Sequence, residues 1–299
     1  MALATLASHS NRDSNSLGGI LLYPPRNWQE IPFLNKETAM ELGLRGKVAI
    51  VTGGARGIGE SIAEGFAREG ANIVIGDLLF EAAQELAEKL NSSGARAIAV
   101  RTDVTKKSDV DNLIATTMKE FGSIDILVNA AGITQDKWVV EVEEADWDRI
   151  LEVNAKSVYL TTKAVMPHMM AARYGKIVNI SSRSGKEGMP GLSHYAASKF
   201  AIIGFTQGVA KELAQYDINV NAVCPGILRT DMWEKILDAR SARMGLPREE
   251  VWSRAMETIP LKRPQVPEDI TNVVLFLSSD VSRNITGEAV SVNGGARMD

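Results

Sequence analysis

The 299 residues of this chain have a globular composition, with 45% hydrophobic and 23% charged residues. The net charge is −4 and no lysine- and arginine-rich stripe is present, which argues against a nucleic-acid-binding surface. No run approaches the roughly 18 apolar residues of a membrane span, and neither His168 nor His194 has neighbours at metal-ligand spacing, so we expect neither a membrane nor a metal partner.

Residues 1–45 differ in character from the rest of the chain. A polar, serine-rich start without the charged region of a secretory signal is followed by apolar groups that prolines interrupt, at Pro25 and Pro32. Proline removes a backbone donor and rules out a regular helix or a central strand there. We therefore predict an extended N-terminal arm whose aromatic side chains dock on the domain or on a neighbouring subunit.

From residue 46 to 299, short apolar runs alternate with segments of helical spacing. The runs are 48–51, 73–75, 97–100, 124–128, 176–180, 220–223 and 289–292. Continuous apolar strands between amphipathic helices indicate a parallel sheet that is covered on both faces. Because strand–helix crossovers are right-handed, we predict an α/β protein with a single doubly wound Rossmann-type domain and a seven-stranded parallel sheet.

The first run leads directly into a glycine-rich loop at residues 52–59, and a predicted helix follows. Gly53, Gly57 and Gly59 allow a tight turn, close approach of the backbone to a pyrophosphate, and close packing of helix on strand. The helix N-terminus offers unpaired N–H groups to phosphates. A P-loop is the rival interpretation, but Glu-Ser follows Gly59, so the phosphate-binding lysine is missing. The loop predicts a dinucleotide site.

Asp77 ends the second run and decides which dinucleotide we expect. A carboxylate there accepts hydrogen bonds from the adenosine ribose hydroxyls and repels a 2′-phosphate, which favours NAD. Arg56 in the glycine-rich loop points the other way, because a cation there can meet a phosphate. No basic residue follows Asp77, so we predict NAD, with NADP the weaker alternative.

Tyr195 and Lys199 are four residues apart, and Ser182 lies thirteen residues before the tyrosine. On a helix, residues four apart share one face. A nearby ammonium favours the phenolate, so we expect Tyr195 to act as a base near neutral pH. Cys224 is the only cysteine, which excludes an intrachain disulfide and favours a reducing, cytoplasmic location.

Together these motifs resemble the short-chain dehydrogenase/reductase family over about residues 44–295. Further matches, in the order of that family, are Asp103-Val104, Asn129-Ala130-Ala131-Gly132, Asn154 and Pro225-Gly226. Ala130 replaces a second asparagine of the usual motif, which should alter support of the sheet more than the chemistry. The resemblance also implies a homotetramer, with helices around 143–170 and 194–214 packing across subunits.

The resemblance implies a catalytic set of four residues. Tyr195 is the expected acid/base, and Lys199 lowers its pKa and binds the nicotinamide ribose. Ser182 hydrogen-bonds the substrate oxygen and stabilises its developing charge. Asn154 holds a water that links Lys199 to solvent. No metal is needed, because Ser182 and Tyr195 polarise the oxygen.

The resemblance also implies the residues that hold the dinucleotide. They are Gly53, Arg56, Gly57, Ile58, Gly59, Asp77, Asp103, Val104, Asn129, Gly132, Tyr195, Lys199, Pro225, Gly226, Ile227 and Thr230. Asp103 and Val104 are the expected adenine contacts, and the segment from Pro225 to Thr230 is expected to hold the nicotinamide.

Substrate choice is expected to depend on residues 186–194 and on a two-helix lid at about 228–262, where loops close over the strand ends. His194 and Trp233 are the expected substrate contacts beside Ser182. The lid length and Asp231-Met232-Trp233 are similar to the NAD-dependent polyol and sugar dehydrogenases of the family, which implies a sugar, a polyol or a small diol as substrate.

Two alternatives remain open. Gly132-Ile133-Thr134 and the run 175–179 suggest a 3-oxoacyl thioester reductase, a class that usually uses NADPH. Some proteins of this fold bind a dinucleotide and act as regulators after losing the tyrosine or the lysine. This chain keeps both residues, which favours an enzyme.

Overall fold

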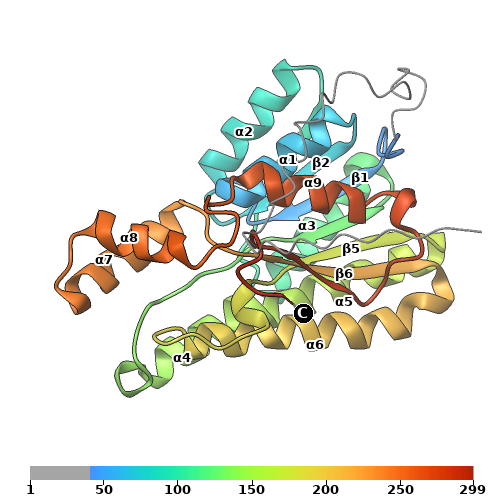
Figure 1. Ribbon diagram of the computed structural model, residues 1–299. Helices are drawn as coiled ribbons and strands as arrows, with labels where there is room; N and C mark the ends of the chain where they lie inside the picture. Colours follow the sequence, from blue (N-terminus) through green and yellow to red (C-terminus); the bar gives the residue numbers. More distant parts are fainter. Residues whose placement is uncertain (1–40, 299) are drawn as a thin grey trace, which may run out of the picture. The chain divides into compact units, whose positions relative to one another are not determined.

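A parallel seven-stranded sheet forms the centre of the computed structural model, which describes residues 41–298 (Figure 1). The strands are β1 Val48–Thr52, β2 Asn72–Asp77, β3 Arg96–Arg101, β4 Ile126–Asn129, β5 Gly175–Ile180, β6 Ile218–Pro225 and β7 Ala289–Val292. Their order is β3-β2-β1-β4-β5-β6-β7. The predicted α/β fold with seven parallel strands is confirmed. The predicted arm lies outside the described residues, apart from 41–45.

Two layers of helices cover the sheet. The helices are α1 Gly57–Arg68, α2 Phe80–Ser92, α3 Lys107–Phe121, α4 Glu144–Leu151, α5 Ser157–Ala172, α6 Ser193–Leu213, α7 Asp231–Met244, α8 Arg248–Glu257 and α9 Pro267–Leu277. Helices α1, α2 and α9 pack on one face, and α3, α5 and α6 pack on the other (Figure 1). Short 3-10 helices are Val139–Glu141, Arg183–Gly185, Ala214–Tyr216 and Asp280–Ser282, and a π-helical turn spans Glu152–Lys156.

Strand β1 shows why the sequence of each strand is a continuous apolar run. Ala49 and Val51 pack into one hydrophobic core, and Ile50, between them, packs into the other. All three are fully buried. Successive side chains of a strand point to opposite faces, so a strand covered on both faces needs an apolar residue at every position.

The topology places a crevice at the carboxyl ends of β1 and β4. Strand β1 pairs with β2 on one side and with β4 on the other, so the strand order changes direction between them. In open parallel sheets, ligands bind outside the carboxyl ends at such a point. Helices α7 and α8 follow β6 and extend from this end of the sheet (Figure 1). We call residues 228–262 the lid segment.

Within residues 41–298, no helix has both the length and the apolar character that crossing a membrane requires.

Candidate active site

One cavity of about 180 Å³ collects most of the predicted catalytic residues. Its walls come from the loops after β4, β5 and β6, from the start of α6 and from the lid segment. Ser182, Tyr195 and Lys199 all line it. The cavity therefore lies at the carboxyl end of the sheet, where the topology predicts a ligand.

Tyr195 and Lys199 lie on the first two turns of helix α6, as their spacing predicts. Both are buried, with 9% and 4% of their surface exposed. The Lys199 Nζ lies 5.7 Å from the centre of the Tyr195 ring and donates a hydrogen bond of 2.9 Å to the carbonyl oxygen of Ile180. The end of β5 thus fixes the ammonium beside the phenol.

Ser182 approaches the phenol from the loop after β5. It caps the 3-10 helix Arg183–Gly185, where its Oγ accepts a hydrogen bond of 3.1 Å from the backbone N–H of Ser184. A side-chain hydrogen bond also joins Ser182 to Tyr195. Two hydroxyl groups therefore converge on one point of the cavity wall, where a substrate oxygen can meet both.

Burial shifts the pKa values of Tyr195 and Lys199 away from the pattern expected from the sequence. Burial raises the pKa of Tyr195 to about 12, although its hydrogen bond with Ser182 acts in the other direction. Burial also lowers the pKa of Lys199 to about 8. The spacing of the two residues suggested a phenolate, but removal from water disfavours both charged forms. The protein environment alone therefore favours the protonated phenol, and the role of Tyr195 as acid or base stays a prediction.

Asn154 lies in the π-helical turn between α4 and α5 and is fully buried. Its Oδ1 accepts a hydrogen bond of 2.8 Å from the N–H of Ile133, and its Nδ2 donates bonds of 3.0 Å to Ile133 O and to Ser198 Oγ. A Cβ at Gly132 would lie 3.3 Å from Asn154 Oδ1 and 3.4 Å from Lys199 Nζ. The glycine thus lets the amide and the ammonium approach the same stretch of backbone.

A network of amide and hydroxyl groups lies beneath the catalytic residues. Asn129 on β4 donates a hydrogen bond of 2.8 Å to Asn179 on β5, and Asn179 donates one of 2.9 Å to Thr206 on α6. Thr161 on α5 donates to Asn129 at 2.7 Å. All four residues are buried. Asn129 and Asn179 together therefore tie the sheet to α5 and α6, and the backbone of Asn129 remains to contact a ligand.

The glycine-rich loop folds as tightly as its sequence predicts. Gly53 has a φ of +65°, and a Cβ there would lie 2.6 Å from Ala131 Cα. A Cβ at Gly59 would lie 2.0 Å from the carbonyl oxygen of Gly53. No side chain fits at either position. The N-terminus of α1 at Gly57 therefore meets the crevice without an intervening side chain, a cradle that fits a pyrophosphate.

Asp77 supports this loop from the end of β2. Its Oδ2 accepts a hydrogen bond of 2.9 Å from the N–H of Ala55, and its Oδ1 accepts one of 2.9 Å from the N–H of Leu79. The carboxylate is thereby held in a fixed orientation at the crevice. Arg56 is largely exposed and lies 3.8 Å from Asp231 at the start of the lid segment.

The other predicted cofactor residues form a row along the same edge. Ile58, Gly132, Pro225, Gly226, Ile227 and Thr230 line the cavity with Tyr195. The carboxyl ends of three further strands carry predicted residues: Asp77 ends β2, Asn129 ends β4 and Asp103 follows β3. In the sheet, β2 and β4 lie on either side of β1, and β3 lies beside β2. Val104 is buried beside Asp103. The length of this row fits an elongated dinucleotide.

The two predicted substrate contacts have different positions. Trp233 lines the cavity and packs edge-to-face against Trp252, with ring centres 5.6 Å apart. His194 is fully buried, does not line the cavity, and has no hydrogen-bond partner among the described residues at either ring nitrogen. Burial lowers its pKa, while Asp146 acts to raise it. His194 thus lies behind the cavity lining, and its contact with a substrate stays a prediction.

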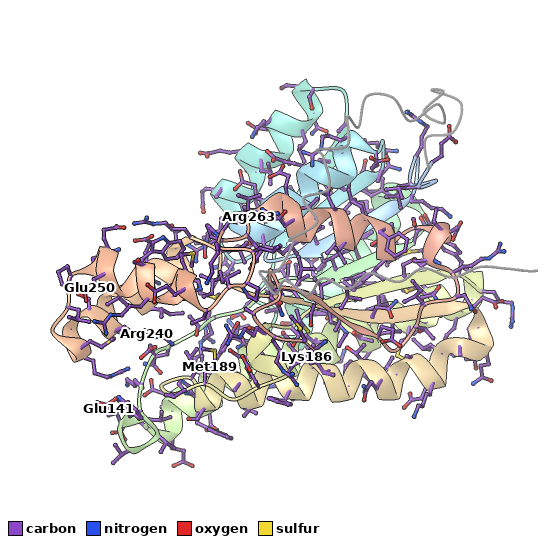
Figure 2. The ribbon with its side chains drawn as sticks, viewed as in Figure 1. Glu141, Lys186, Met189, Arg240, Glu250 and Arg263 are labelled. Atoms are coloured by element: carbon purple, nitrogen blue, oxygen red, sulfur yellow. The ribbon has the colours of Figure 1, made fainter. Side chains whose placement is uncertain are left out.

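Sequence reasoning predicted the segments of the cavity wall better than its individual residues. The apolar members of the lining include Met189, Leu192, Met232, Trp233 and Ile236, which lie within the predicted ranges 186–194 and 228–262, and among them only Trp233 was predicted by name. Thr134 and Arg240 are polar members of the lining. Arg240 projects from α7 on the side of the loop that carries Glu141 (Figure 2). No motif marks this arginine, because its partner Asp136 lies 104 positions away in the chain.

Comparisons with known proteins agree with this geometry. A family model described as short chain dehydrogenase matches residues 47–241. The chain is 40% identical over 252 residues to the 3-oxoacyl-(acyl-carrier-protein) reductase FabG of Thermotoga maritima, with 84% of this chain and 98% of that protein covered. It is 40% identical over 257 residues to the protein of the same name from Aquifex aeolicus (86% and 99%). An uncharacterized oxidoreductase of Mycobacterium bovis is 38% identical over 252 residues (84% and 97%).

Proposed function

Since the chain belongs to the short-chain dehydrogenase family and is an oxidoreductase acting on a CH–OH or keto group, we propose that it reduces the 3-oxo group of an acyl thioester. The observation that carries this proposal is the similarity, over nearly the full length of the relatives, to 3-oxoacyl-(acyl-carrier-protein) reductases. A polyol or sugar substrate, the first expectation from sequence, has less support. The regulatory alternative is not favoured, since Tyr195 and Lys199 both line the cavity.

The cavity wall supports an acyl substrate over a polyol. A bound polyol loses hydrogen bonds to water at each hydroxyl, and each loss costs about 1–3 kcal/mol unless the protein replaces it. The wall formed by Met189, Leu192, Met232, Trp233 and Ile236 offers almost no such partners. An acyl chain gains from the same wall by burying apolar surface.

The buried phenol of Tyr195 is suited to donate a proton when the reaction runs as a reduction. Reduction of a ketone requires a proton donor at the oxygen, and the buried phenol keeps its proton at neutral pH. A bound reduced nicotinamide dinucleotide would supply the hydride. Tyr195 would give its proton to the substrate oxygen, and Ser182 would donate a hydrogen bond to the same oxygen.

Lys199 is suited to return the proton to Tyr195. Its pKa of about 8 lets the amine gain and lose a proton near neutrality, and Ile180 O holds it in place. Asn154 contacts the neighbouring residue Ser198 and the backbone of Ile133, so it would shape the path from Lys199 toward solvent.

We propose NADH as the preferred cofactor. The Asp77 carboxylate is fixed at the end of β2 by two backbone N–H groups, where a ribose 2′-phosphate would meet its negative charge. Arg56, the cation of the glycine-rich loop, lies within ion-pair distance of Asp231 instead of being held beside Asp77. This preference concerns the adenosine end of the dinucleotide and is independent of the substrate class.

The exposed face of α5 and α6 supports a homo-oligomer, and we propose a homotetramer. A groove of about 310 Å³ on this face is lined in part by Tyr159, Met166 and Phe205. Phe200 is 46% exposed on the same helix, α6, which is apolar over much of its surface. A helix that is apolar all round is normally covered. A monomer in light scattering at micromolar concentration would contradict this proposal.

The decisive test is a substrate panel on the purified protein. We expect oxidation of NADH with an acetoacetyl thioester to exceed reduction of NAD⁺ with sugar alcohols. We expect Tyr195→Phe to lower turnover by about 10²- to 10⁴-fold, because the general acid is lost. Dinucleotide affinity, measured by fluorescence titration, should stay within about twofold. Faster oxidation of a polyol, or near-normal turnover in Tyr195→Phe, would reject the proposal.

A further inference from the structure

Asp136 is a fully buried carboxylate outside the catalytic set, and it joins three separate segments around the cavity. Its side chain has 0% exposure. Its Oδ2 accepts a hydrogen bond of 2.8 Å from Arg240 Nε, and its Oδ1 accepts one of 2.5 Å from Arg243 Nη1. Arg243 Nη2 also donates to the Asp136 carbonyl oxygen at 3.3 Å. Both arginines belong to helix α7 of the lid segment.

Gly191 closes the third side of this cluster. A Cβ at Gly191 would lie 2.8 Å from Asp136 Oδ1 and 3.3 Å from Arg243 Nη1, and its φ of +77° favours glycine. The carbonyl oxygen of Gly191 accepts a hydrogen bond of 2.9 Å from the N–H of Lys137. The loop after β5 therefore packs directly against the carboxylate that holds α7.

Apart from Leu228 and Ile259 near its ends, the lid segment buries few apolar side chains. Helix α7 buries only Ile236 and Leu237, and α8 buries only Val251. Segments with few buried apolar contacts open at low free-energy cost. Buried, charge-assisted hydrogen bonds are about twice as strong as neutral ones. The two bonds to the Asp136 carboxylate are therefore a large part of what attaches α7 to the domain.

The cluster also shapes the substrate end of the cavity. Arg240 lines the cavity, and its guanidinium lies 5.8 Å from the ring centre of Trp233, which lines it too. Asp136 binds Arg240 through Nε, which fixes the plane of the guanidinium beside the indole. A change at Asp136 would thus reach the cavity through Arg240 and Trp233.

We propose that Asp136 is a positioning residue that holds helix α7 against the loops after β4 and β5 and so sets the shape of the substrate end of the cavity. Asp136 touches neither the substrate oxygen nor the catalytic pair in this role. The attachment of α7 is independent of the proposed function, whereas its effect on substrate kinetics depends on it.

The test is hydrogen–deuterium exchange of the full-length protein, read by mass spectrometry. Asp136→Asn keeps the shape of the side chain but removes its charge, and Arg243→Met removes one donor without altering a cavity-lining residue. We expect peptides covering α7 to exchange about tenfold faster or more in both variants, as expected from weakening a buried charged bond. Peptides covering β1 and α1 should keep wild-type rates. Glu141→Gln is the matched control, since Glu141 is exposed and lies 3.9 Å from Arg243.

Kinetics supply the second measurement. With an acetoacetyl thioester, we expect the KM of Asp136→Asn to rise several-fold while kcat changes by less than about twofold. Wild-type exchange of α7 in both variants, or an equal increase over the whole protein, would overturn the positioning role. Faster exchange of α7 with no thioester reduction by the wild type would leave the attachment proven and reject only the proposed substrate.

Discussion

The buried ammonium of Lys199 makes a testable contribution to stability. The pKa of Lys199 is about 8 in the folded protein against an ordinary value of 10.5, and burial is the cause. The folded protein therefore binds this proton more weakly than the unfolded chain does. Below pH 8 the buried charge destabilises the fold, and stability rises as the pH increases from 8 toward 10.5. At pH 7 the cost is roughly 3 kcal/mol by linkage.

The perturbation is Lys199→Met, which removes the titrating group and keeps most of its volume. Linkage predicts that the free energy of unfolding of the wild type rises by roughly 1 kcal/mol between pH 7 and pH 9 relative to the variant. Other titrating groups are common to both proteins and cancel in the difference. The upper limit of pH 9 keeps Tyr195 protonated in both states, since the pKa of Tyr195 is raised to about 12.

The assay is urea unfolding at pH 7, 8 and 9, followed by tryptophan fluorescence at one protein concentration. A stability difference that stays constant, or that falls as the pH rises, would refute the reasoning. Either result would mean that Lys199 keeps an ordinary or raised pKa in the folded protein. It would then be unable to exchange a proton with Tyr195 near neutral pH in the proposed way.

Three further predictions test other parts of the site. Gly59→Ala should weaken dinucleotide binding at least tenfold in a fluorescence titration, because the added Cβ would lie 2.0 Å from the carbonyl oxygen of Gly53. Gly188→Ala is the control and should bind the dinucleotide normally, since nothing lies within 4 Å of its added Cβ. Asp77→Ser should lower the NADH-over-NADPH preference in kcat/KM by about tenfold or more; an unchanged ratio would show that Asp77 does not choose the cofactor. Asn129→Ala should lower the free energy of unfolding, measured in urea, by about 2–3 kcal/mol, since it leaves the buried partners of Asn129 unpaired. Asn72→Ala is the control and should lower the free energy of unfolding far less, because the hydrogen bond of Asn72 to Gly46 is exposed.

The fold could be predicted because burial on both faces requires an apolar residue at nearly every position of a strand. The first and last residues of the strands were harder to predict. Residues 124–128 were predicted as one strand, but β4 begins at Ile126, because the carboxylate of Asp125 accepts the backbone N–H of Val48 at 2.8 Å and lies 3.7 Å from Lys47. A hydrogen bond between residues 77 positions apart has no local signal in the sequence.

The catalytic residues could be predicted where they are close in sequence, and not where they depend on tertiary packing. Tyr195 and Lys199 lie on one helix, as their spacing requires. Their pKa directions depend on burial, which spacing does not reveal. Asp136 and Arg240 meet only because the lid segment folds back onto the loop after β4. The position of His194 inside the protein also depends on packing that no motif records.

The amide network between β4, β5, α5 and α6 has a mechanical consequence. Purely apolar contacts allow a helix to slide along its axis at modest cost, whereas a directional bond such as that from Asn179 to Thr206 tolerates little axial travel. Thr206 lies two helical turns from Lys199, and the Lys199 backbone carbonyl is itself bonded by Ser181 Oγ at 2.9 Å. Helix α6 is thus pinned lengthwise to the centre of the sheet. The phenol keeps its alignment with the strand ends whatever the size of the substrate that enters, and only the outer wall has to adapt.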